Sequence, residues 1–134
     1  MNTRFADTYY FIALLNPADP DHQRIREFTL ASRDRLVTTG LVLAEVANHL
    51  SYTRSRSLVQ PFFARLASDP RAEIVPADRA MLQRGLEYYH ARPDKEWSLT
   101  DCVSFLVMTD RELTEALTAD HHFEQAGFAA LLKE

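Results

Sequence analysis

The sequence predicts an α/β domain of three layers, in which a central, mostly parallel sheet of about four to five short strands carries helices on both faces. Short apolar segments alternate with longer amphipathic segments along the chain, and this alternation is typical of a parallel sheet with covering helices. The 134 residues suit one domain. Because no linker, repeat or low-complexity tract interrupts the pattern, we expect a single domain over residues 1–134.

The first half of the chain is expected to form two strands and four helices. Asn16-Pro17 ends the first helix, and Gly40 ends the second strand. The expected order is strand 3–6, helix 9–15, helix 20–31, strand 36–39, helix 41–52, a basic bend at 53–57 and helix 58–67.

The second half is expected to add two strands and three helices. Asp78 and Ser98 are residue types that cap helix N-termini, and Gly127 favours a chain reversal. The expected order is strand 73–76, helix 78–91, a loop at 92–97, helix 99–109, strand 115–118 and a short helix at 121–125.

The composition is that of a soluble globular protein, with 46% hydrophobic and 25% charged residues. No segment approaches the roughly 20 apolar residues of a membrane-spanning helix, the N-terminus shows no secretion signal, and Cys102 is the only cysteine. We therefore expect a cytoplasmic protein without a membrane partner. The net charge of −4 argues against a broad basic face for nucleic acid, unless several acids bind cations that invert the local field.

Three acids are expected at one edge of the sheet. Asp7 follows the first strand, Asp120 follows the last expected strand, and Asp101 lies in the first turn of a helix. The carboxyl ends of parallel strands and the N-termini of the following helices meet at the same edge, where ligands bind. Each acid taken alone has another explanation, because Asp caps helices well and residues 98–101 have the form of a capping box.

Glu45 makes a metal site the better explanation. It lies in a helix, 41–50, that is apolar nearly all round, so its side chain is expected to be buried. A buried carboxylate needs a partner, and no basic residue lies at helical spacing. His49, four residues on, is the alternative partner. Four converging carboxylates would repel one another, and Mg²⁺ or Mn²⁺, which prefer oxygen ligands, would relieve that repulsion.

Four blocks of sequence resemble the PIN domain family, and more narrowly the VapC-type toxins of bacterial toxin–antitoxin pairs. The resemblance spans the whole chain, and the last block is the most specific. The blocks are Phe5-Ala6-Asp7-Thr8, Leu41-Val42-Leu43-Ala44-Glu45-Val46, Ser98-Leu99-Thr100-Asp101-Cys102, and Ala116-Leu117-Thr118-Ala119-Asp120-His121-His122-Phe123.

The resemblance implies a Mg²⁺-dependent endoribonuclease in which Mn²⁺ can substitute and metal-activated water cuts RNA. It carries the catalytic and metal-binding roles onto Asp7, Glu45, Asp101 and Asp120. Asp7, Asp101 and Asp120 are expected to be the nearer ligands, and Glu45 is expected to bind a second ion or a metal water. The resemblance also implies a homodimer and a VapB-like antitoxin partner.

Other polar and aromatic residues near these blocks have two explanations each. Thr8 and Thr100 could support a carboxylate or simply start a helix. Arg54 and Arg56 could contact RNA phosphates or lie in a solvated turn, and Trp97 could stack on a base or pack inside the protein.

No transition-metal or cysteine chemistry is expected. Adjacent His121 and His122 are expected to project apart at the surface, without the spacing of a zinc site. Cys102 is expected to be a small core residue.

Three alternative functions are open. A housekeeping PIN nuclease would keep the chemistry without an antitoxin. A receiver-like module would need a lysine near a late strand, whereas the only lysines are Lys95 and Lys133. A non-catalytic nucleic-acid-binding module would not need all four acids.

Overall fold

The computed structural model describes residues 2–134, and its central sheet is built from short apolar strands that are all parallel. The strand order is β3-β2-β1-β4-β5, and the central strand pairs Phe5 with Val37 on one side and with Ala116 on the other. The strands are β1 (Thr3–Ala6), β2 (Arg35–Thr39), β3 (Ala72–Val75), β4 (Glu115–Leu117) and β5 (Ala129–Ala130). The predicted parallel α/β sheet is confirmed.

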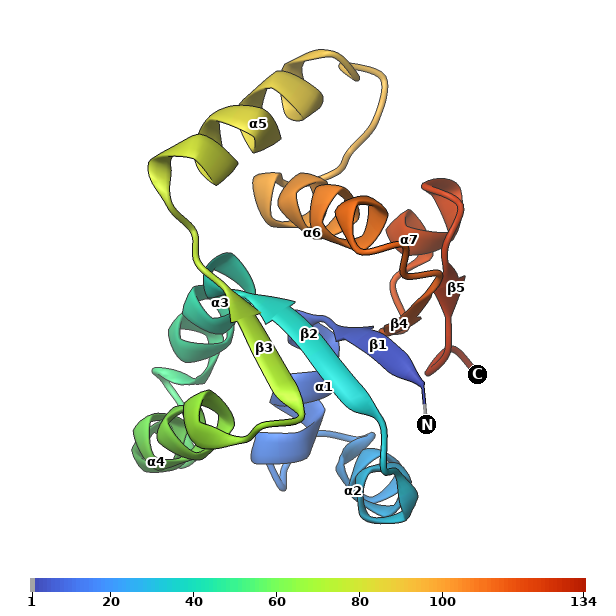
Figure 1. Cartoon of the computed structure of the whole chain (residues 1–134). Helices are drawn as coiled ribbons and strands as arrows, with labels where there is room; N and C mark the ends of the chain where they lie inside the picture. The colour runs from blue at the N-terminus through green and yellow to red at the C-terminus, as the bar shows by residue number, and fades with distance from the viewer. Residues whose placement is uncertain (1) are drawn as a thin grey trace.

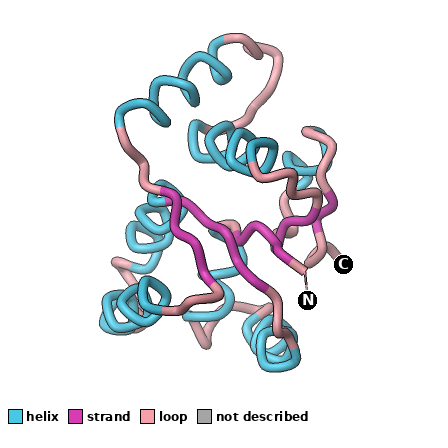
Figure 2. The backbone as a smooth tube through the Cα atoms, viewed as in Figure 1, coloured by secondary structure: helices cyan, strands magenta, loops and turns pink. Residues whose placement is uncertain are grey.

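Helices cover both faces of this sheet (Figures 1 and 2). One face carries α1 (Thr8–Leu15), α2 (His22–Ala31), α3 (Gly40–Leu50) and α4 (Arg56–Ser68). The other face carries α6 (Leu99–Asp110) and α7 (His121–Gln125), and α5 (Arg79–His90) packs on the outside of α6. Aromatic side chains pack between and within the layers, since Phe5 of β1 contacts Phe123 of α7, and Phe11 of α1 contacts the half-buried Phe62 of α4 on the opposite face.

The order of the strands places a topological switch point between β1 and β4, the position at which an open parallel sheet forms a ligand-binding crevice. The chain first moves outward from β1 through β2 to β3, and then returns to place β4 on the opposite side of β1 (Figure 1). Connections on the two sides of such a switch point diverge, so the carboxyl ends of the two strands stay open to a ligand. Asp7 follows β1 and Asp120 lies three residues beyond β4.

The expected boundaries differ from the observed ones mainly at turns. Helix α2 begins at His22 rather than at residue 20, because Pro20 belongs to the preceding turn. Helix α3 ends at Leu50, and α4 already starts at Arg56, inside the segment expected as a bend. Strand β5 was not expected, because two alanines carry no periodic signal. Among residues 2–134, no helix has the length and apolar character needed to cross a membrane.

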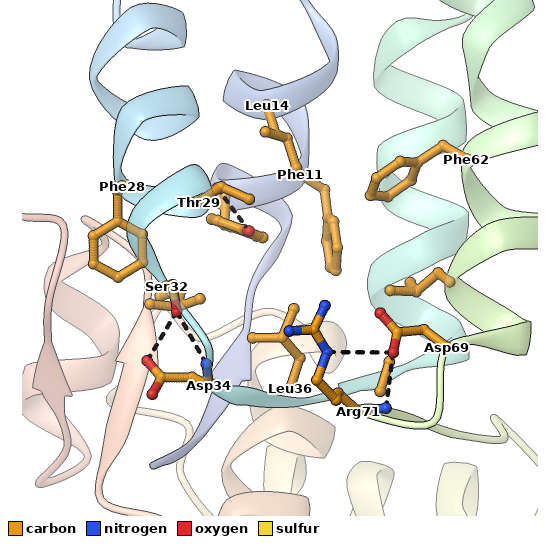
Figure 3. A pocket seen from close by; sticks show the side chains of 14 residues that line it. Phe11, Leu14, Phe28, Thr29, Ser32, Asp34, Leu36, Phe62, Asp69 and Arg71 are labelled. Carbon is orange, nitrogen blue, oxygen red and sulfur yellow. Dashed lines mark hydrogen bonds and ion pairs between the residues drawn. The ribbon is translucent and has the colours of Figure 1, made fainter. Parts of the chain in front are cut away.

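A cavity of about 160 Å³ lies between α1, α2, α4 and the sheet (Figure 3). Its walls include Leu36 and Ala72, near the amino ends of β2 and β3, and the aromatic rings of Phe11, Phe28 and Phe62. None of the four candidate acids lines it. The cavity is therefore separate from the crevice at the carboxyl ends of β1 and β4.

Candidate metal centre

Asp7 is a buried carboxylate at the start of α1. Asp7 occupies the N-cap position of α1, yet its side chain makes no capping hydrogen bond. Instead Oδ2 accepts a hydrogen bond of 2.8 Å from Thr118 Oγ1, and Asp7 is only 6% exposed. Burial raises the pKa of Asp7 to about 7, and the nearby charges of Asp101 and Asp120 act in the same direction. Side-chain capping is thus excluded for Asp7.

Thr118 joins the two strand ends and was not identified from the sequence. Its fully buried hydroxyl donates to Asp7 and accepts a 3.1 Å hydrogen bond from the backbone N–H of Asp120. The hydroxyl therefore fixes Asp7 relative to Asp120 across the crevice. The only sequence signal for this role was a threonine two residues before an aspartate that follows a strand.

Asp101 both caps α6 and faces the crevice. Ser98 and Asp101 form a capping box, in which Asp101 Oδ2 accepts from the Ser98 backbone N–H at 3.2 Å. The same oxygen lies 3.1 Å from His122 Nδ1. Asp101 is 8% exposed, and burial raises its pKa, with a further contribution from the charge of Asp120. Capping and a place in the candidate site therefore coexist at this residue.

Asp120 caps α7 and is half-buried between the two histidines that follow it. Its Oδ1 accepts a hydrogen bond of 2.9 Å from the backbone N–H of His122. His121 Nδ1 and His122 Nδ1 lie 3.6 Å and 3.5 Å from the same oxygen. The expectation of two diverging surface histidines was wrong for His122, whose side chain is 18% exposed and lies between Asp101 and Asp120.

Glu45 is half-buried rather than buried, which corrects the expectation for α3. The helix buries Val42, Val46 and Leu50, whereas the face with Asn48 and His49 is exposed. The apolar composition of α3 led to an overestimate of the burial of Glu45, because alanines and one turn of the helix remain at the surface. Glu45 Oε1 accepts a hydrogen bond of 2.6 Å from Thr8 Oγ1.

The hydrogen bond from Thr8 settles which residue partners Glu45. In the described part of the chain, His49 makes no ion pair with Glu45, so the pairing proposed as an alternative does not form. Because Thr8 directly follows Asp7, the bond ties Glu45 to the first turn of α1. The Thr8 hydroxyl therefore supports the Glu45 carboxylate, which was one of the two explanations for this residue.

The arrangement suits a hard divalent cation. Within residues 2–134, no lysine or arginine forms an ion pair with any of the four acids. The basic side chains that contact these acids are His121 and His122. Buried carboxylates with raised pKa values and no lysine or arginine partner are stabilised as anions by a nearby cation. Oxygen donors of this kind fit Mg²⁺ or Mn²⁺, with Asp7, Asp101 and Asp120 as the residues that would hold the ion.

The remaining candidates lie apart from this donor set or face into the core. Arg54 is exposed between α3 and α4, and Arg56 is exposed at the first position of α4, where it donates to the Ser51 carbonyl. Thr100 is half-buried, and its hydroxyl has no hydrogen bond to any residue in the described range.

Trp97 and Cys102 are core residues. Trp97 is buried, stacks on Tyr88, meets Phe105 edge to face and donates from Nε1 to Gln125. Its indole is therefore not offered to a nucleic acid base, and packing is the explanation that holds. Cys102 is also buried, and burial raises the pKa of its thiol to about 11, which leaves it unreactive.

The lysine needed by a receiver-like module is missing from the crevice. Lys95 pairs with Asp94, and Lys133 pairs with Glu124. Both ion pairs are exposed, and neither involves one of the four acids.

Comparisons with known proteins identify the family and support the fold. The sequence model described as "PIN domain" matches residues 4–129. The chain is 28% identical over 131 residues to the 23S rRNA-specific endonuclease VapC20 of Mycobacterium tuberculosis, covering 97% of this chain and 98% of the relative.

Two solved structures share the fold. The crystal structure of M. tuberculosis VapC20, described as a sarcin-ricin loop cleaving toxin, has a TM-score of 0.81 at 22% identity and covers 93% of this chain and 95% of that one. VapBC2 from Rickettsia felis, bound to a DNA fragment from their promoter, has a TM-score of 0.63 at 15% identity and covers 97% of both chains. The resemblance inferred from the four sequence blocks is confirmed.

Proposed function

Because this chain belongs to the PIN domain family, we propose that it is a metal-dependent endoribonuclease and the toxin of a type II toxin–antitoxin pair. The similarity to an endonuclease named VapC20 supports this activity. A single domain of residues 1–134 carries the whole site in this proposal. The preferred ion is Mg²⁺, and Mn²⁺ substitutes for it.

One observation supports the proposal most directly. Asp7, Asp101 and Asp120 come from three distant stretches of sequence, yet their charges act on one another in the β1–β4 crevice. Burial that raises the pKa of Asp7 to about 7 costs stability when the carboxylate is charged, and such perturbed acids are concentrated at functional sites. A divalent cation bound there supplies a nucleophilic water near neutral pH and stabilises charge on the phosphate.

The protein side chains then have separate tasks. Asp7, Asp101 and Asp120 bind the cation, and Glu45 completes the acid set while Thr8 holds its carboxylate. Thr118 keeps Asp7 in place through a buried hydrogen bond. Such positioning matters because a metal site with loosely held ligands loses affinity and activity.

The RNA substrate, the antitoxin and the dimer also belong to this proposal. Arg54 and Arg56 are exposed and carry positive charge to the α3–α4 turn, so they are candidates for phosphate contacts. Relatives named VapC and the likeness to VapBC2 support a VapB-like antitoxin as partner. A homodimer is expected from the family.

The activity is tested with purified protein and a panel of structured and unstructured RNAs. We expect cleavage with Mg²⁺, no cleavage with excess chelator, and a loss of at least about 100-fold in Asp7→Asn, since removal of one electrostatic group from an active site has effects of that order. Asp94→Asn is the matched control, because Asp94 is an exposed acid outside the site. Cleavage that persists in chelator, or an active Asp7→Asn protein, contradicts the proposal.

The toxin role is tested separately from the chemistry. Expression of the wild-type chain should stop bacterial growth, and co-expression of the small protein encoded beside it should restore growth. The Asp7→Asn variant should not stop growth. RNA cleavage in vitro without growth arrest would favour the housekeeping nuclease instead.

A further inference from the structure

The start of α7 brings nitrogen donors to the edge of the carboxylate crevice. Asp120, His121 and His122 each offer a ligand atom, and these atoms all lie within 4.8 Å of one another. His122 Nδ1 also faces Asp101. We propose that Asp120, His121 and His122 form a binding site for a transition-metal ion of the Zn²⁺ class, which shares Asp120 with the oxygen-ligand site that includes Asp7.

The distances fit the ligand shell of such an ion. A tetrahedral ion with bonds of about 2.0 to 2.1 Å separates its ligand atoms by roughly 3.4 Å. His122 Nδ1 lies 3.5 Å from Asp120 Oδ1, and His121 Nδ1 lies 3.6 Å from the same oxygen. Two separations between donor atoms therefore match the edges of a tetrahedron, in which three protein ligands leave the fourth position to water.

The donors are held by the fold to different degrees. Asp120 is fixed by hydrogen bonds at its own backbone N–H and at Oδ1, and His122 lies against two carboxylates. His121 is 66% exposed, and its ring is 4.5 Å from the His122 ring, so it can rotate toward the ion without disturbing the core. The exposed His121 side chain is therefore the donor that is freest to adjust to an ion.

The two classes of ion would use different subsets of these residues. Imidazole nitrogen is a good ligand for Zn²⁺, whereas Mg²⁺ prefers oxygen ligands and retains water. Asp7 contributes oxygen only, and its side chain is hydrogen-bonded to Thr118, whereas the two histidines contact Asp101 and Asp120. Because both subsets include Asp120, Zn²⁺ binding would exclude Mg²⁺ and inhibit cleavage, a consequence that rests on the proposed function.

The binding test uses metal-free protein without RNA. Zn²⁺ and Mg²⁺ are titrated separately by calorimetry, and Co²⁺ serves as a spectroscopic probe, because nitrogen ligation changes its visible absorption. We expect Zn²⁺ to bind at least tenfold more tightly than Mg²⁺. His121→Ala and His122→Ala should each weaken Zn²⁺ binding by at least about tenfold, because the loss of a group that only supports a ligand already costs that much in metal sites.

The control variants separate this site from the acid crevice. His49→Ala removes an exposed histidine on α3 and should bind Zn²⁺ as the wild type does. Asp7→Asn should lose Mg²⁺ binding and retain Zn²⁺ binding, while His121→Ala should do the reverse. Circular dichroism of each variant verifies that it is folded.

The outcomes distinguish this inference from the proposed ribonuclease. Zn²⁺ binding that is no tighter than Mg²⁺ binding, or that both histidine variants retain, overturns the transition-metal site. Tight histidine-dependent Zn²⁺ binding in a protein that cuts no RNA leaves the site intact and refutes only the activity.

Discussion

Replacing Asp7 by Asn should stabilise the metal-free protein while removing its response to Mg²⁺. Asn keeps the shape of the side chain, and its amide oxygen can still accept the hydrogen bond from Thr118 Oγ1. The substitution removes only the charge from a residue that is 6% exposed. Its effect on stability therefore reports the cost of burying that charge.

The size and sign of the effect follow from the pKa of Asp7. Burial raises it from 3.8 to about 7, which is about three units, or about 4 kcal/mol at 1.36 kcal/mol per unit. The folded chain keeps the Asp7 proton up to about pH 7, whereas the unfolded chain releases it near pH 4. Between these values the folded state binds more protons, so wild-type stability falls as pH rises from about 4 to 7 and then levels off.

Urea unfolding of both proteins at pH values from 4.5 to 8.5 in chelator measures this difference. The wild type should lose up to about 4 kcal/mol relative to Asp7→Asn across the window, because surface acids titrate equally in the two proteins and cancel. Mg²⁺ at pH 8 should stabilise the wild type only. Parallel stability curves for the two proteins would show that Asp7 is not strained, and the argument for a cation would fail.

Three further substitutions test the packing around the site. Thr118→Val removes a fully buried hydroxyl, so it should cost about 1 to 3 kcal/mol in urea unfolding and, by deleting the hydrogen bond that lowers the Asp7 pKa, weaken Mg²⁺ binding at pH 7 in calorimetry. Gly85→Ala places a Cβ 2.5 Å from Val103 Cγ2 in the α5–α6 contact, and overpacking of about 1 to 3 kcal/mol should exceed the gain of about 1 kcal/mol in helix propensity, which lowers the melting temperature. Trp97→Ala should cost about 3 to 5 kcal/mol in urea unfolding, as expected for a core aromatic, and an unchanged stability would return Trp97 to the list of RNA contacts.

The sequence predicted the placement of the acids because that placement depends on topology. Asp7 and Asp120 follow parallel strands, and any parallel sheet carries the residues after its strands to one edge. Thr118 could not be assigned in the same way. Its hydroxyl reaches a residue 111 positions away, and that contact depends on which strands pair and in what register.

Glu45 and His122 show a second limit of sequence patterns. An apolar segment indicates a buried helix, but it does not indicate which turn reaches the edge of the sheet, so the burial of Glu45 was overestimated. Adjacent histidines usually project apart, yet the short helix α7 turns both rings toward Asp120. Both errors concern side-chain direction, which depends on how each helix is placed against the sheet and which an apolar pattern alone does not determine.

The three aspartates differ in how cleanly a substitution tests the site. Asp101 and Asp120 accept hydrogen bonds from the backbone at the starts of α6 and α7, so an Asn variant at either residue changes a helix cap together with the charge. Loss of a cap costs about 1 kcal/mol, and it opposes the gain from removing a buried charge. Asp7 makes no such cap, so only its substitution isolates the electrostatic strain that a cation would relieve.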